Sequence, residues 1–207
     1  MERESFFHAL NQKSIARKAA KLLGKTYEEA RLIVIHMGGG VSVAAHENGL
    51  AVDDFNVKDE GAFGMDRAGS LPVNAMINLC FSGLTKQEVK KLLGSEAGAY
   101  SYVGTKDFRE VERRAFEEND PDCRMVFDAM AYQLAKDIGA MAAVLKFQVD
   151  AIVYTGGMAY SDRFTQAITD YVGNLAPVLR LPGEEEMRSL AEGALRVLHG
   201  EQAKVYP

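Results

Sequence analysis

Tryptophan is absent from this 207-residue sequence, and cysteine is scarce, with two residues. Cys80 and Cys123 lie far apart and in no spacing that is typical of metal ligands, so we expect no structural zinc site. Both lie in apolar stretches that favour helix. We therefore expect two buried free thiols in a reducing cytosol.

Long apolar runs and an excess of positive charge are missing as well. The most apolar stretch, residues 140–147, contains Lys146 and follows Lys136 and Asp137, so we expect no membrane span. The first residues have no apolar core of the signal-peptide type. Lys and Arg number 24 against 29 Asp and Glu, which excludes the broad positive field that non-specific nucleic-acid binding needs. We expect a cytoplasmic protein that binds neither a membrane nor a nucleic acid.

Hydrophobic residues make up 47% of the sequence, which is enough for one domain with its own core. The pattern of residues 12–23 predicts an amphipathic helix. The apolar, β-branched run 31–36 predicts a buried strand, and the following stretch alternates around Asn48-Gly49, a pair typical of hairpin turns. Three successive strands are therefore expected near the N-terminus.

The middle of the chain, residues 56–120, is predicted to be a glycine-rich and helical insertion. The expected elements are an irregular segment (56–69), a helix (71–81), a second helix opened by the capping box Thr85–Glu88, a loop (98–106) and a charged helix (107–118).

The C-terminal part alternates between helix and strand patterns. We predict helices at 121–147, 161–173 and 184–199, and strands at 151–156 and 177–181. One face of the first helix carries small and apolar residues, namely Met125, Ala129, Tyr132, Ala135, Gly139 and Ala142. Alternating strands and helices predict an α/β fold, with helices on both faces of a partly parallel sheet that the hairpin makes mixed.

The first candidate site is the run His36-Met37-Gly38-Gly39-Gly40 between two predicted strands. Glycines leave the backbone amides bare, so a phosphate can approach them without meeting a Cβ. A plain tight turn explains the same residues. No lysine follows the run, so it is not a Walker-type loop.

The second candidate is Thr155-Gly156-Gly157-Met158, where a buried strand ends and a helix begins. Ligands of open α/β sheets bind at the carboxyl ends of strands, and helix N-termini favour anions. Tight packing between strand and helix is the alternative explanation.

Other positions are weaker signals when taken singly. Arg67 on a flexible, glycine-flanked loop suits capture of a phosphate or carboxylate, although a lone loop arginine is usually only solvated. His8, before a helix, is by itself a structural histidine. Asp107-Phe108-Arg109 resembles an ordinary helix start with Asp107 as N-cap, and Glu184–Glu186 a solvated first turn.

The order and local context of these segments are more specific than any one of them. The segments FHALNQK, HMGGGVSV, DRAGSLP, TKDFREVE, YTGGMAYS and LPGEEEM resemble the butyrate kinases of the acetate kinase family, and the resemblance extends from Phe7 to about Gly200. It implies a ribonuclease H-like fold of the actin, Hsp70 and sugar kinase type. In that family two such domains hold a nucleotide between them, and residues 1–207 resemble the C-terminal, nucleotide-binding domain.

The resemblance also implies a role for each candidate residue. ATP or ADP would be bound by His36, Gly38, Gly39 and Gly40 at the phosphates and by Asp107, Phe108, Arg109, Gly156, Gly157 and Met158 around the adenosine. Arg67 and His8 would be catalytic, with His8 stabilising the phosphoryl group in flight. Glu185 would help to hold Mg²⁺.

The implied reaction is reversible phosphoryl transfer between ATP and butyrate, which gives butyryl phosphate and ADP. Branched-chain acids and acetate are alternative acceptors. An arginine, a histidine donor, bare amides and Mg²⁺ suit this chemistry, because two anions must be brought in line and their charge neutralised. A homo-oligomer is also expected.

Family members carry an N-terminal domain of comparable size, which this chain lacks. The resemblance implies that the missing domain supplies another phosphate turn, part of the carboxylate pocket, a second arginine and a catalytic aspartate. A catalytically inactive nucleotide-binding or oligomerisation fragment is therefore the alternative function.

Overall fold

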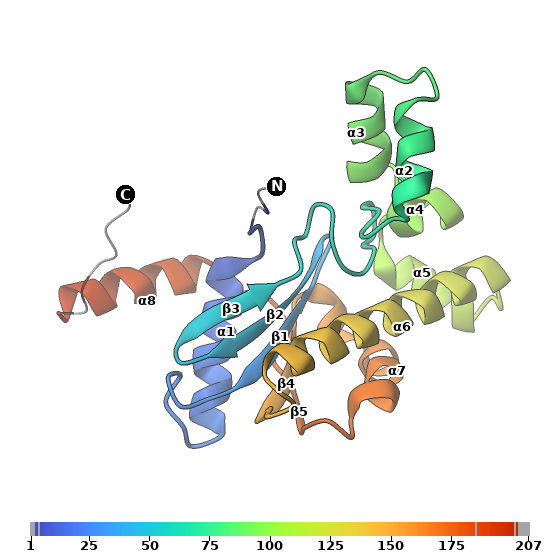
Figure 1. Cartoon of the computed structure of the whole chain (residues 1–207). Coiled ribbons are helices and arrows are strands. Elements are labelled where there is room, and N and C mark those ends of the chain that lie inside the picture. The colour runs from blue at the N-terminus through green and yellow to red at the C-terminus, as the bar shows by residue number, and fades with distance from the viewer. Residues whose placement is uncertain (1–2, 4, 185, 201, 203–207) are drawn as a thin grey trace.

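A mixed sheet forms the centre of the protein in this computed structural model, which describes residues 3, 5–184, 186–200 and 202. The five strands lie in the order β3-β2-β1-β4-β5 (Figure 1). β1 (Leu32–Met37), β2 (Val41–Glu47) and β3 (Leu50–Asp54) form antiparallel pairs, and β4 (Ala151–Thr155) and β5 (Val178–Arg180) continue the sheet in parallel with β1. The predicted mixed α/β fold is confirmed.

Helices cover both faces of the sheet, as predicted. α1 (Ala9–Leu22) packs on the face that carries Leu32 and Val34 of β1. α6 (Pro121–Val144) covers the opposite face, where Ile33 and Ile35 point. All six residues of β1 are buried, which explains why its sequence is a continuous apolar run and does not alternate with polar residues.

The insertion after β3 and the C-terminal part supply the remaining elements. They are α2 (Val73–Cys80), α3 (Lys86–Gly94), α4 (Gly98–Val103), α5 (Phe108–Phe116), the 3₁₀ helix η1 (Gly157–Tyr160), α7 (Asp162–Val172) and α8 (Glu186–Leu198). α2 and α3 project from the body as a helical hairpin (Figure 1). The predicted capping box of α3 is confirmed, since Thr85 and Glu88 each accept a hydrogen bond from the backbone of the other. In the part of the chain that the structure describes, no helix combines the length and apolar character needed to cross a membrane.

Three predicted element boundaries are wrong. Residues 98–106 are not wholly a loop, because Gly98, with φ +60°, opens the short helix α4. The long helix ends at Val144 and not at residue 147. Lys146 and Phe147 adopt φ values of 54° and 58°, which are incompatible with a right-handed helix. The first helix begins at Ala9 and not at residue 12.

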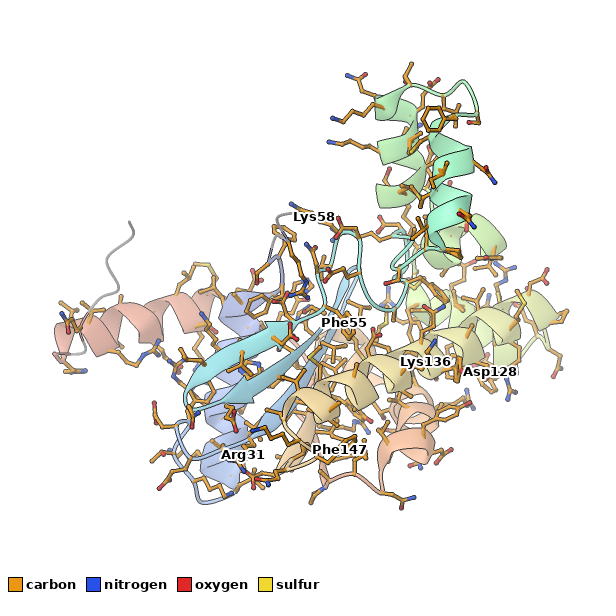
Figure 2. All side chains as sticks on the ribbon, in the orientation of Figure 1. Arg31, Phe55, Lys58, Asp128, Lys136 and Phe147 are labelled. Atoms are coloured by element: carbon orange, nitrogen blue, oxygen red, sulfur yellow. The ribbon has the colours of Figure 1, made fainter. Side chains whose placement is uncertain are left out.

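The small and apolar face of α6 that the sequence shows is only partly buried. Met125 and Tyr132 are each 51% exposed, whereas Ala135 and Ala142 are buried. The helix contacts the sheet as well as α5 and α7, so its buried surface is broad. The larger residues that it buries are Val126, Phe127, Met130, Leu134, Ile138 and Met141. The exposed Asp128 and Lys136 of this helix are labelled in Figure 2.

The two cysteines lie in different environments. Cys123 is buried in the core, as predicted, and burial raises the pKa of its thiol to about 11. Cys80 is exposed, so the prediction that both thiols are buried is wrong for this residue. Its helix, α2, buries none of its residues.

Candidate active site

The two glycine turns meet at one edge of the sheet. β1 and β4 are parallel neighbours with His36 opposite Thr155, so the turns that follow these strands begin side by side. A Cβ on Gly156 would lie 2.4 Å from the carbonyl oxygen of Met37, and Gly156 has φ +86°. Glycine is therefore required for this close approach.

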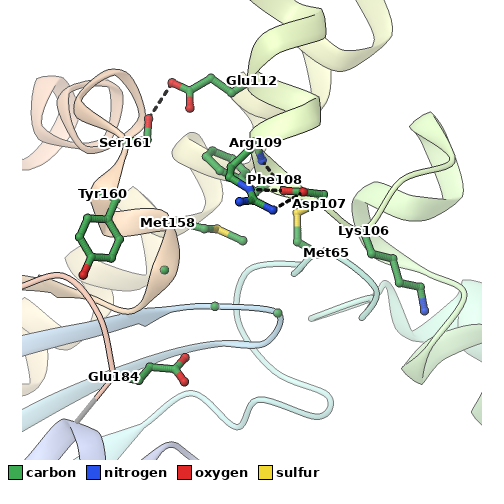
Figure 3. Close-up of a pocket in the computed structure, with 13 residues that line it drawn as sticks. Met65, Lys106, Asp107, Phe108, Arg109, Glu112, Met158, Tyr160, Ser161 and Glu184 are labelled. Atoms are coloured by element: carbon green, nitrogen blue, oxygen red, sulfur yellow. Dashed lines mark hydrogen bonds and ion pairs between the residues drawn. The ribbon is translucent and has the colours of Figure 1, made fainter.

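The turns border a cleft of about 930 Å³ (Figure 3). Seven of the residues predicted to bind the nucleotide line it: Gly38, Gly39, Asp107, Phe108, Arg109, Gly157 and Met158. The lining is completed by Met65, Lys106, Glu112, Tyr160, Ser161 and Glu184, to which the sequence analysis assigned no role. The two turns and the start of α5 therefore border the same cleft.

The start of α5 forms one wall of the cleft. Phe108 is buried, and its ring centroid lies 4.6 Å from that of Phe164. Asp107 caps the helix by accepting a hydrogen bond of 2.9 Å from Arg109 N, so the N-cap interpretation is confirmed. The Arg109 guanidinium also donates to Asp107 and holds the pKa of that carboxyl below its ordinary value.

Three other predicted residues lie outside the cleft lining. Gly156 is held against β1 and pairs with Gly183 through two backbone hydrogen bonds of 3.1 Å, so the packing explanation holds for it. Gly40 faces Arg67, whose Nη1 would lie 3.2 Å from a Cβ at position 40. His36 is 1% exposed, and its Nε2 would lie 3.2 Å from a Cβ on Gly38.

A second depression, of about 400 Å³, holds both predicted catalytic residues. His8 and Arg67 line it together with Val57 and Phe6. Gly38 and Gly39 line the larger cleft, whereas Gly40 touches Arg67. The glycine turn after β1 therefore lies next to both hollows.

The turn that carries Arg67 is fixed by backbone hydrogen bonds, in contrast to the flexible loop that the sequence suggested. Gly64 N donates to Arg67 O over 3.1 Å, and Ala99 N donates to Gly64 O over 3.1 Å. A Cβ on Gly98 would lie 2.3 Å from Gly64 O and 2.8 Å from Arg67 O. The glycine at the start of α4 thus lets this helix pack directly on the turn.

His8 and His36 form a stacked pair, with ring centroids 3.8 Å apart and planes at 19°. Burial is the main cause that lowers the pKa of each ring to about 4. For His8, the adjacent His36 ring and the Arg67 charge also lower the pKa, while Glu184 opposes them. Both rings are therefore neutral at neutral pH. His8 Nδ1 lies 2.9 Å from Ser42 Oγ.

Of the described residues in the acidic run 184–186, Glu184 lines the cleft. The predicted magnesium residue, Glu185, lies outside the described residues. Glu184 Oε1 lies 3.2 Å from His36 Nε2 and would lie 3.3 Å from a Cβ on Gly38, and Figure 3 shows it across the cleft from Arg109. Among the described residues no group of three or more His, Cys, Asp or Glu could hold a metal ion by itself. Mg²⁺ is commonly held by one or two carboxylates and the substrate phosphates, and Glu184 beside the glycine turn fits that pattern.

Comparison of the sequence with known proteins identifies kinases that act on short-chain carboxylates among its relatives. The sequence model of the acetokinase family matches residues 3–187. The chain is 47% identical to butyrate kinase 1 of Clostridium acetobutylicum over 207 residues, which are 99% of this chain and 58% of that protein. It therefore spans less than two thirds of the relative's length.

The fold has close counterparts among solved structures. Acetate kinase from Porphyromonas gingivalis superposes with a TM-score of 0.83 at 22% identity, over 93% of this chain and 55% of that one. A ROK family protein from Streptococcus pneumoniae, solved with sucrose, gives a TM-score of 0.54 at 13% identity over 91% and 65%. These likenesses confirm the predicted fold of the sugar kinase type. With the match of the family model over most of its length, this chain belongs to the acetokinase family.

Proposed function

We propose that this chain is the nucleotide-binding part of a short-chain carboxylate kinase, which transfers a phosphoryl group reversibly between ATP and butyrate to give butyryl phosphate and ADP. One observation carries the proposal: a nucleotide-sized cleft and a depression with a histidine and an arginine lie next to the same glycine turn. The 47% identity to a butyrate kinase supports butyrate as the acceptor. Branched-chain acids and acetate are the alternative acceptors.

The nucleotide is assigned to the larger cleft. Its volume lies within the usual range of small-molecule sites. Phe108 and Met158 offer apolar surface to the adenine, and Arg109 and Asp107 lie at the rim beside it. Gly39 leaves room for the phosphates at this turn, since a Cβ on it would have no atom within 4 Å.

The transfer itself is assigned to the second depression. The γ-phosphoryl group would pass the glycine turn toward Arg67, whose guanidinium neutralises the charge that develops on its oxygens. His8, which is neutral, would donate a hydrogen bond to the same group. Bound Mg²⁺ would offset the negative charge of the phosphates, and Glu184 is the described residue suited to hold it.

The carboxylate acceptor would complete the site together with a second domain. The chain spans 58% of the butyrate kinase that it matches, and the family resemblance assigns part of the acyl pocket to the remainder. A nucleotide-binding or oligomerisation fragment without catalysis is therefore the second candidate. The same difference in length favours it.

The test joins this chain to the N-terminal part of the Clostridium acetobutylicum butyrate kinase that it does not match. Acyl hydroxamate formation from butyrate, MgATP and hydroxylamine is expected in the fusion and not in the chain alone. Arg67→Ala should lower kcat by roughly 10²-fold or more, because the developing charge loses its cation. Undiminished turnover in that variant would remove Arg67 from the mechanism. A fusion that binds MgATP without turnover would favour the second candidate.

A further inference from the structure

A network of buried polar side chains, linked by hydrogen bonds, leads to His8. The proposed mechanism does not use this network. Tyr27 OH lies 2.8 Å from His46 Nδ1, and His46 Nε2 lies 3.2 Å from Gln12 Oε1. Gln12 Nε2 lies 2.9 Å from Ser42 Oγ, which lies 2.9 Å from His8 Nδ1. Gln12 and His46 have no exposed surface, and Tyr27 and Ser42 are at most 5% exposed.

The side chain of Gln12 determines which atoms donate and which accept in this network. Its Nε2 also lies 3.1 Å from the backbone carbonyl of Ser42, and a carbonyl only accepts hydrogen bonds. The amide therefore turns its nitrogen to Ser42 and its oxygen to His46. It follows that His46 carries its proton on Nε2, and that its bare Nδ1 accepts from the hydroxyl of Tyr27.

The same assignment of donors and acceptors determines which ring nitrogen of His8 carries the proton. Ser42 Oγ already accepts a hydrogen bond from Gln12. Among the described residues, the remaining partner for the buried Ser42 hydroxyl hydrogen is His8 Nδ1, and a buried hydroxyl that donates to nothing is costly. His8 Nδ1 is then an acceptor, and the proton of the neutral ring lies on Nε2.

Asn11, which precedes Gln12 in α1, determines the proton position of His36, the second ring of the stacked pair. Thr155 Oγ1 donates to Gly183 O over 3.1 Å, so it accepts from Asn11 Nδ2 at 3.4 Å. The same nitrogen donates to His36 Nδ1 over 2.8 Å. His36 therefore also carries its proton on Nε2, the atom 3.2 Å from Glu184.

We propose that Gln12, acting through Ser42, is a positioning residue that keeps the proton of His8 on Nε2, where it is available to the transferred phosphoryl group. This inference rests on the proposed function for its catalytic meaning. A ring with its proton on Nδ1 would turn a lone pair toward the phosphoryl oxygens and repel them. Gln12 does not touch the phosphoryl group and acts only through the His8 ring.

Nuclear magnetic resonance of the ¹⁵N-labelled histidine rings tests the proton position directly in this chain. Bare and protonated ring nitrogens have well-separated shifts, and loss of signals in His8→Asn assigns the ring. The wild-type chain should show a bare Nδ1 and a protonated Nε2 for His8. The opposite pattern would overturn the proposal, whatever the variants do.

Gln12→Glu should reverse the direction of the hydrogen bonds from position 12 through Ser42 to His8, with almost no change in side-chain volume. At a pH where the new carboxyl is ionised, it can only accept, so the Ser42 hydroxyl turns to it and His8 must donate from Nδ1. The Nδ1 and Nε2 signals of His8 should therefore interchange, and unchanged signals in the folded variant would contradict the proposal. Ser42→Ala, which removes the link, should give averaged His8 signals if Gln12→Glu does not fold. Asn11→Asp is the matched control, because it should alter His36 and leave His8 as in the wild type.

The activity arm uses the fusion protein described above. Gln12→Glu should lower kcat by roughly tenfold or more and change KM for MgATP by less than about twofold, since the nucleotide cleft is a separate hollow. A merely structural role would not combine interchanged His8 signals with this selective loss of kcat. An inactive wild-type fusion would count against the proposed function alone, because the ring spectra still decide the position of the proton.

Discussion

The turn after β1 and the turn after β4 carry glycines that are alike in the sequence and unlike in the fold. At Gly156 a Cβ would strike the backbone of β1, whereas at Gly39 and Gly157 it would have no atom within 4 Å. Gly39 and Gly157 line the cleft, and Gly156 does not. A glycine turn thus holds residues of two kinds, one needed for packing and one that leaves room for a ligand.

The largest effect that separates the two kinds is expected at Gly156. Gly156→Ala should lower the free energy of unfolding by about 3 kcal/mol or more, because the new Cβ meets Met37 O at 2.4 Å and the backbone has φ +86°. Denaturant titration followed by circular dichroism measures the change. Gly157→Ala, one residue further, should alter stability by less than about 0.5 kcal/mol, and equal effects at both positions would break the comparison.

Gly61 is another glycine that is needed for packing, and it lies against a buried carboxylate. A Cβ on it would lie 2.7 Å from Asp137 Oδ2, which accepts a hydrogen bond of 2.6 Å from Ala62 N. This contact ties the insertion to α6. Burial raises the pKa of Asp137 to about 6, against the opposing effects of the Ala62 N–H and of Lys136.

The raised pKa predicts the sign of a pH effect on stability. The folded state holds the Asp137 proton more tightly than the unfolded chain does, so stability from this group is full below the ordinary carboxyl pKa and is lost as the pH rises through about 6. Relative to wild type, Asp137→Asn should gain roughly 2 kcal/mol in the free energy of unfolding between about pH 4.5 and pH 7.5. Asp128→Asn, on the exposed side of the same helix, is the matched control for the loss of a carboxylate. A flat difference for Asp137→Asn would contradict the assignment.

The sheet and the edge that carries the site could be predicted from local patterns. The apolar runs of β1 and β4 are too short for helices and end in glycines. The glycines after β4 were predicted to lie at the carboxyl end of a strand, where ligands of α/β sheets bind. Asp107 was recognisable as a helix cap by residue type and position. These features depend on residues that are close together in the sequence, so they could be predicted from a single sequence.

The rest of the site depends on contacts that are distant in the sequence. Gln12 was predicted to begin an amphipathic helix, and nothing local showed that α1 buries its polar side chain beside β2. Met65 and Lys106 reach the cleft because the insertion folds back onto the glycine turn, as the bond from Met65 N to Gly39 O shows. Within an unbroken acidic run, the composition does not distinguish Glu184 from its neighbours.

The smallest effect on stability, and the sharpest on binding, is expected where a glycine borders open space. A Cβ on Gly157 would have no atom within 4 Å, and the residue lines the cleft, so Gly157→Leu should change the free energy of unfolding by less than about 0.5 kcal/mol. The affinity of this chain for MgATP, measured by calorimetry, should nevertheless fall by roughly tenfold or more, because the leucine occupies the space assigned to the adenosine. Gly94→Leu is the matched control, since that glycine also has open space around it but lies at the end of α3, outside the cleft lining. Equal affinity in the two variants would mean that the nucleotide does not bind between the two glycine turns, and the parallel drawn here between open backbone and ligand binding would fail.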